Sequence, residues 1–204
     1  MEYAYSRYGA NGDFISTLIR APTRPRYVNL VEGGNVIHYP FIPLTPVPQT
    51  NAQADMFYAW RGPDPEFKST SLAGDQSIAR WNPPRQRVTD VWERYKATAL
   101  QEIPDDGTQQ RYARLFNQDL PLLEHVPVVS TLLIDTEGNM WIERYRLPWE
   151  EDPVWDVIDA SGHWLGTVNT PRRFNLFDIG ADYVLGRHRD DLGIERIQMY
   201  GLQK

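Results

Sequence analysis

The histidines are the first residues whose chemistry the sequence offers, and the chain has four: His38, His125, His163 and His188. None stands in the H-x-H or H-E-x-x-H spacing that holds a zinc ion. His188, Arg189 and Asp190 spell the triplet of a kinase catalytic loop, but no Gly-rich loop and no D-F-G motif accompany them. We therefore expect each histidine to lie at the surface or at a strand end, without a catalytic role.

The serines and the acidic turns are the remaining candidates for a reactive or metal-binding site. Ser130 and Ser161 lack the G-x-S-x-G elbow of serine acyl transfer. Oxygen ligands that suit a cation occur in two segments, at Asp135, Glu137 and Asn139 and at Asp178 and Asp182. Neither segment has the calcium-loop spacing, so we expect ordinary turns with solvated carboxylates. The sequence assigns no catalytic residue, no cofactor and no metal ligand.

An internal repeat indicates which elements would position any site. The segment YSRYGANGDFISTL aligns without a gap on WDVIDASGHWLGTV, which places Gly12 on Gly162. Each copy is an aromatic or β-branched run, a turn that ends in Gly, and a second alternating run, which is the pattern of a β-hairpin. A weaker third copy, FYAWRGPDPEFKSTS, has Pro65 in the place of Gly12.

Between about Val88 and His125 the apolar spacing changes from the period of a strand to that of a helix. Asp90 and Glu93 have the spacing of a capping box, and the run from Pro104 to Gly107 ends the first of two short helices. We expect the aromatic residues of these helices to pack on the sheets rather than to hold a cofactor.

The resulting fold class is all-β with a small helical insertion, in a single domain over 1–204. The prediction is an incomplete β-propeller of about three blades of four-stranded antiparallel sheet, with a β-sandwich as the alternative. The parts are a hairpin at 2–20, a blade at 27–80, the two-helix insertion at 88–125, a blade at 129–169 and closing strands at 174–200. Because closure requires roughly four blades or more, we expect either that the chain is the C-terminal part of a longer protein or that it pairs with a second copy.

Composition excludes several classes of partner. A net charge of -6 and the lack of a basic stripe argue against binding to nucleic acid. The absence of Cys excludes disulfides, thiolate zinc sites and a cysteine nucleophile. No apolar run approaches the ~20 residues of a membrane span, and no signal peptide is visible. The expected compartment is the periplasm or cell surface if the N-terminus is truncated, and otherwise the cytoplasm.

The C-terminal part resembles a known family from about residue 127 onward. The run from Asp135 to Trp141, the hairpin around Gly162 and the run from Asp182 to Gly186 are similar to the last blades of bacterial six-bladed, NHL-like β-propeller proteins, which are largely uncharacterised. His188 departs from the pattern, since an apolar residue is more usual there. The resemblance implies the fold and little about activity.

Two function classes follow from this prediction. The first is a non-catalytic propeller that binds a protein, peptide or glycan on one face, for which Trp149 and Trp155 are candidate contacts. The alternative is a metal-dependent propeller hydrolase or lactonase whose remaining ligands lie in blades absent from this chain. We favour the binding or scaffold module, with an unknown ligand.

Overall fold

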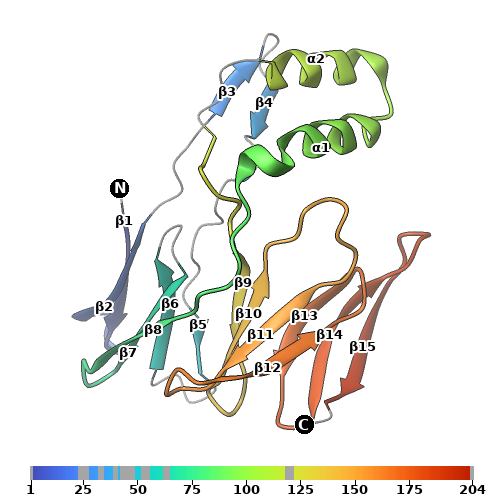
Figure 1. Ribbon diagram of the computed structural model, residues 1–204. Coiled ribbons are helices and arrows are strands. Elements are labelled where there is room, and N and C mark those ends of the chain that lie inside the picture. The colour runs from blue at the N-terminus through green and yellow to red at the C-terminus, as the bar shows by residue number, and fades with distance from the viewer. Residues whose placement is uncertain are drawn as a thin grey trace.

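A computed structural model describes residues 2–22, 28–31, 35–38, 41, 49–51, 56–61, 65–117 and 122–202. In these residues the fold is mostly β, with antiparallel sheets and two helices (Figure 1). No helix in the described part of the chain is long and apolar enough to cross a bilayer.

Two sheets are four-stranded antiparallel meanders in which consecutive strands are neighbours. One consists of β5 (Gln49–Thr50), β6 (Met56–Arg61), β7 (Glu66–Ser71) and β8 (Gln76–Arg80). The other consists of β9 (Val129–Ile134), β10 (Met140–Arg144), β11 (Val154–Ile158) and β12 (Trp164–Asn169). The second sheet fills the range 129–169.

Three smaller groups of strands complete the β-structure. A three-stranded sheet contains β13 (Phe174–Ile179), β14 (Tyr183–Arg189) and β15 (Glu195–Gly201). The two hairpins are β1 (Glu2–Tyr8) with β2 (Phe14–Pro22), and β3 (Val28–Val31) with β4 (Asn35–His38). Residues 27–80 thus hold two sheets rather than the single four-stranded unit that we expected, because β3 and β4 pair with each other and not with β5.

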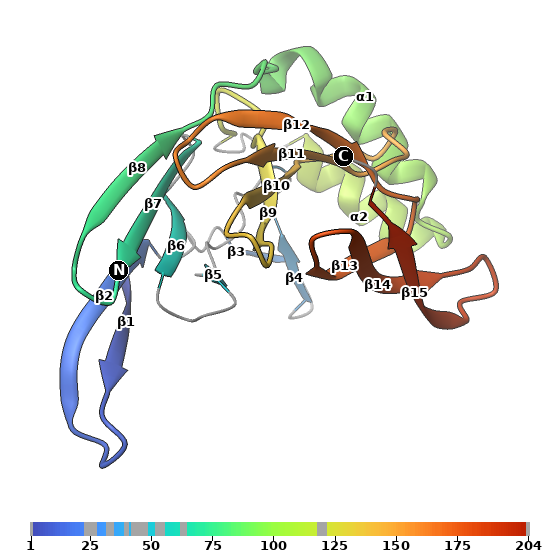
Figure 2. The same cartoon turned by 90° about the horizontal axis from the view of Figure 1, so that it is seen from below.

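The sheets are arranged along an arc, with β5, β9 and β13 on its concave side and β8 and β12 on its convex side (Figure 2). Two apolar cores join neighbouring sheets. The core between β5–β8 and β9–β12 is built around Phe67, Ile142 and Ile158. The core between β9–β12 and β13–β15 is built around Trp141 and Trp155. Both faces of β9–β12 are therefore covered, and burial of these apolar faces is the main force that holds the arc together.

The helical insertion consists of α1 (Val88–Gln101) and α2 (Asp106–Phe116). The predicted capping box is wrong: Arg87 is the N-cap of α1, with no side-chain hydrogen bond, and Asp90 lies within the first turn. Asp105 caps α2 instead, since its side chain accepts from the Thr108 N–H. The aromatic stripe of α1 packs in a core with Phe41, Val126 and Leu147, which lie in segments between the strands and not on the sheets, where we expected it to pack.

The hairpins β1–β2 and β11–β12 have the same turn and the same β-bulge. At the turns the Gly9 N–H donates to the Asp13 carbonyl at 2.8 Å, and the Asp159 N–H donates to the His163 carbonyl at 2.9 Å. Gly12 and Gly162 have φ of 86° and 93°, values that favour glycine. The register shifts after Arg7 in one hairpin and after Val157 in the other, so Tyr8–Phe14 corresponds to Ile158–Trp164.

The same turn recurs between β7 and β8, where Gly74 has φ of 95° and the Ser71 N–H donates to the Asp75 carbonyl. The third copy of the turn is therefore at Gly74 and not at Pro65. The proline ring holds φ near -65°, so a proline does not replace a glycine of positive φ.

Candidate functional site

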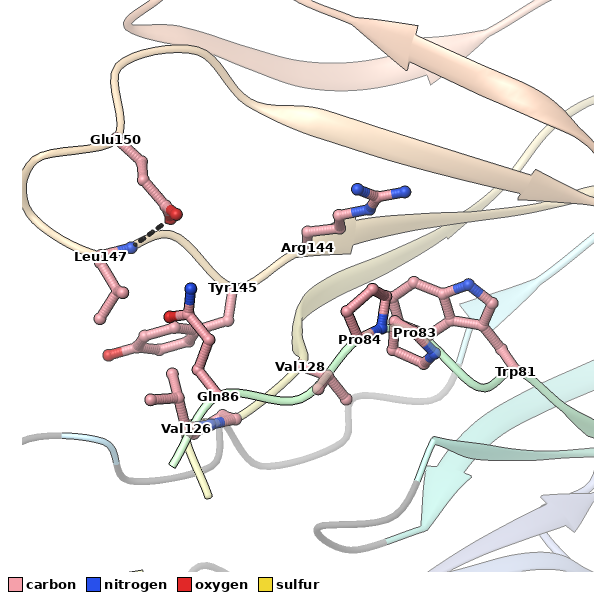
Figure 3. Close-up of a pocket in the computed structure, with 11 residues that line it drawn as sticks. Trp81, Pro83, Pro84, Gln86, Val126, Val128, Arg144, Tyr145, Leu147 and Glu150 are labelled. Carbon is pink, nitrogen blue, oxygen red and sulfur yellow. Dashed lines mark hydrogen bonds between the residues drawn. The ribbon is translucent and has the colours of Figure 1, made fainter. Parts of the chain in front are cut away.

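A pocket of about 210 Å³ lies where three segments distant in sequence converge (Figure 3). They are the link from β8 to α1, the link into β9, and the end of β10 with the loop that follows it. The residues that line the pocket are Trp81, Pro83, Pro84, Gln86, Val126, Pro127, Val128, Arg144, Tyr145, Leu147 and Glu150. Most of this surface is apolar, so the pocket offers hydrophobic contact with few polar groups.

Backbone hydrogen bonds hold the two links against each other beneath the helices. The Val88 N–H donates to the Glu124 carbonyl at 3.1 Å, and the Val126 N–H donates to the Gln86 carbonyl at 2.9 Å. The Tyr145 N–H donates to the Val128 carbonyl at 3.0 Å, which ties the end of β10 to the same links. Pro83, Pro84 and Pro127 restrict the backbone further. Backbone hydrogen bonds and prolines thus hold the pocket wall in place.

Arg144 is the positively charged group of the pocket, and Asp156 on β11 fixes its position. The Nε and Nη2 atoms of Arg144 donate to the two carboxylate oxygens of Asp156 at 2.7 and 2.9 Å. Asp156 has 1% of its surface exposed, and it also accepts from Trp164 Nε1 at 3.0 Å and Thr167 Oγ1 at 3.2 Å. Burial raises the pKa of Asp156, but these hydrogen bonds outweigh it and lower that pKa below its ordinary value.

The Nη1 group of Arg144 makes no hydrogen bond to another described residue. Its two N–H donors are therefore available to a ligand. Because Asp156 already compensates the positive charge, this part of the pocket suits a neutral acceptor such as a carbonyl oxygen more than a free anion.

Glu150 and Tyr145 are the other polar groups of the pocket. Glu150 Oε2 accepts from the Leu147 N–H at 2.8 Å and closes the loop between β10 and β11 (Figure 3). Burial, with a smaller contribution from Tyr95, raises the pKa of Tyr145 to about 12. The Tyr145 hydroxyl therefore keeps its proton near neutral pH. Among the residues that the structure describes, neither Glu150 nor Tyr145 hydrogen-bonds to a histidine or to a nucleophile that would make a catalytic pair.

The structure brings one histidine and one serine of the sequence analysis together, in an exposed turn, and places the others elsewhere. His125 forms a β-bridge with Arg87 at the base of the helices, whereas His163 lies in the β11–β12 turn beside Ser161, with 2.7 Å between its Nδ1 and the Ser161 Oγ. His188 lines a second cavity with Arg172, Arg173 and Arg189. His38 is the last residue of β4, and Ser130 lies on β9.

The acidic turn at Asp135 differs from our expectation of a solvated carboxylate. Asp135 is buried, and its Oδ1 accepts from the Glu137 and Asn139 N–H groups at 2.9 and 2.8 Å. Its Oδ2 accepts from Trp141 Nε1 at 3.0 Å and from the Asn139 side chain. Asp178 accepts from the Tyr183 hydroxyl, and Asp182 is exposed. Among the described residues, no three His, Asp or Glu side chains come together as a metal site.

The two tryptophans singled out as contacts are both engaged in packing. Trp155 is buried and donates from Nε1 to Thr170 Oγ1 at 3.2 Å. The Arg94 guanidinium lies 4.3 Å from the ring centroid of Trp149. Sequence reasoning missed Trp81, Arg144 and Asp156. The sequence feature that could have identified Asp156 was a single Asp within the apolar run VWDVI, because a carboxylate in a buried strand needs a charged partner.

The comparisons with known proteins add no name to this site: no family model, no curated protein and no solved structure matches the chain.

Proposed function

We propose that this chain is a non-catalytic binding module of the β-propeller class and that the pocket between Trp81 and Glu150 is its ligand site. The arc of antiparallel meanders supports the propeller proposal, as does the resemblance of the C-terminal part to NHL-like proteins. The observation that carries the binding proposal is Arg144, which a buried carboxylate fixes at the edge of a rigid apolar pocket.

The size of the pocket favours a single side chain as its occupant. A volume of about 210 Å³ is smaller than the roughly 300–1,000 Å³ of pockets that enclose drug-sized ligands. An apolar anchor residue of a peptide fits the lining of proline, valine and leucine, and its backbone carbonyl would accept from Arg144 Nη1. Because the Trp81 ring is almost fully buried, it offers little of the exposed aromatic face on which a sugar would stack. We therefore favour a peptide over a glycan.

The test uses end-blocked tetrapeptides with one central residue varied between leucine, phenylalanine and glutamate, titrated into the isotopically labelled chain. We expect the leucine and phenylalanine peptides to shift the NMR resonances of Trp81 and Val128, and the glutamate peptide to leave them unchanged. Gln86→Trp should fill the pocket and weaken binding by about tenfold or more, a loss of about 1.4 kcal/mol. Asn82→Trp, at an exposed position outside the lining, is the matched control and should bind as the wild type does.

Two results would contradict the proposal. One is that no apolar peptide shifts the pocket resonances. The other is that Gln86→Trp and Asn82→Trp bind equally well, because the ligand would then lie elsewhere.

A further inference from the structure

The hairpin β1–β2 has one face that no described segment covers. Its β2 strand lies against β6 and β7 on the other face. Tyr8 corresponds to Ile158 through the shared turn and bulge. Ile158 is 3% exposed because it packs against the β5–β8 sheet, whereas Tyr8 is 61% exposed. Phe14 pairs with Tyr8 across the hairpin and is exposed as well. Trp164, the counterpart of Phe14, is exposed too. At Tyr8, however, the free face of this hairpin presents a large apolar side chain where its repeat buries one.

The other end of the arc has a second uncovered face. One face of the β13–β15 sheet contributes Phe174, Leu176 and Ile179 to the core with β9–β12. The opposite face presents Ile197 and Met199, which are 65% and 68% exposed, and the exposed Phe177. The same face includes Arg187, which pairs with Ile197 across the sheet and forms an ion pair with Glu195. Soluble proteins rarely leave large apolar side chains grouped on a sheet face without a partner.

The repeat indicates what each uncovered face would bind. In the arc, the hairpin β11–β12 packs its Ile158 face against the preceding β5–β8 sheet. Among the described residues, no sheet precedes the equivalent Tyr8 face of β1–β2 and no hairpin follows the outer face of β13–β15. One chain therefore presents both faces of a further contact like the one that β11–β12 and β5–β8 make inside it. The hairpin β1–β2 and the sheet β13–β15 lie at the two ends of the arc (Figure 2).

We propose that the outer face of β13–β15 binds the Tyr8 face of β1–β2 from a second copy of this chain. The contact is head-to-tail, and two copies that make it twice close a ring. Within the ring, Ile197 and Met199 take the place that Phe67 has opposite Ile158 inside the chain. The peptide pocket is not part of either face, so this inference is independent of the proposed function.

Sedimentation velocity of the full chain is the first test. We expect a species of twice the 23.7 kDa chain mass. The variants Ile197→Glu/Met199→Glu and Tyr8→Glu/Phe14→Glu should each reduce it to the single-chain mass, because each removes one partner from every contact. Leu165→Glu is the control, since Leu165 is an exposed apolar residue outside both faces, and it should leave the mass unchanged.

Mixing the two double variants distinguishes head-to-tail pairing from any other dimer. A mixed pair keeps one intact contact, between the β1–β2 face of one variant and the β13–β15 face of the other. We expect the mixture to have a higher average mass than either variant alone. A wild-type chain that stays at single-chain mass would overturn the proposal, as would a mixture that stays there or a wild-type mass that rises beyond two copies.

Cysteine cross-linking tests the same contact without charge substitutions that could disturb folding. The chain has no Cys, so Phe14→Cys and Met199→Cys each introduce a single thiol. Under mild oxidation the mixture of these two variants should form a disulfide-linked pair, and Phe14→Cys mixed with Leu165→Cys should not. Equal cross-linking in both mixtures would overturn the proposed pairing of faces.

Discussion

The hairpins β1–β2 and β11–β12 share a turn, a bulge and a repeat in sequence, yet they differ in their surroundings. Each has a glycine of positive φ, at position 12 or 162, and a register shift four to five residues before it in the first strand. β11–β12 belongs to a sheet that is covered on both faces, whereas β1–β2 is a two-stranded hairpin with exposed aromatic residues. Local sequence therefore determines the hairpin geometry, and neighbouring sheets determine what that geometry buries.

The residues at corresponding positions reflect this difference. Asp156 corresponds to Ser6. Asp156 pairs with Thr167 across its hairpin, and Ser6 pairs with Thr17, the equivalent threonine of the repeat. Asp156 is buried with Arg144 as its partner, while the hairpin position has a small neutral residue. Of the two hairpins, the one whose sheet continues to β10 thus has an ionic contact to a buried carboxylate.

The largest expected effect is at this pair of positions. Asp156→Ala should destabilise the chain by about 3 kcal/mol, because it removes the buried carboxylate that accepts hydrogen bonds from Arg144 and two other side chains. The Arg144 side chain is 43% exposed, so water can solvate its charge in the variant. Ser6→Ala should change the stability by about 0.5 kcal/mol or less. Urea unfolding monitored by tryptophan fluorescence measures both. Equal losses would show that the two hairpins are equally integrated in the fold.

The next comparison is between the apolar residues at the bulge. Ile158→Ala should cost about 2–3 kcal/mol, because it opens a cavity in the core beside Phe67 and Trp81. Tyr8→Ala should cost about 0.5 kcal/mol or less when the chain is dilute enough to be single. Thermal unfolding at low and at high chain concentration measures the loss of stability of Tyr8→Ala in the single chain and in the proposed pair. If Tyr8→Ala at low concentration were as costly as Ile158→Ala, the hairpin face would be covered within one chain.

The smallest effect concerns the acid in the β11–β12 turn. Hydrogen bonds from Ser161, and then from the His163 N–H, lower the pKa of Asp159 to about 2. Because this folded-state pKa lies below the ordinary carboxyl value, the turn gains stability above that value and loses it as the pH falls toward 2. Gly9 occupies the same place in β1–β2, so that turn lacks this dependence.

Carbon NMR of the Asp159 carboxyl group over acid pH measures this pKa. Ser161→Ala should raise it, while Ser130→Ala, on β9, should not. An Asp159 pKa near 4 in the wild type would contradict the prediction.

Sequence alone predicted the local parts of the fold and missed the site. The Gly12 and Gly162 turns and the two helices follow from short-range patterns, which act within a few residues. The division of residues 27–80 did not, because short-range patterns do not report whether the β3–β4 hairpin joins the strands that follow it or forms a separate sheet. The pocket was also missed, since Trp81, Val128 and Arg144 meet only through the packing of three separate segments. The Arg144–Asp156 contact required the register of β10 on β11, which no pattern in either strand reports.

The antiparallel contact between residues 86–88 and 124–126 has a consequence for the evolution of the chain. The two ends of the helical segment are hydrogen-bonded to each other. The segment is therefore attached to the sheets at one place, as a short loop would be. Natural variants can then lengthen, shorten or exchange α1 and α2 while the strand register stays as it is. Such a crossing makes the helices the part of the protein in which new specificity arises at the least cost to folding.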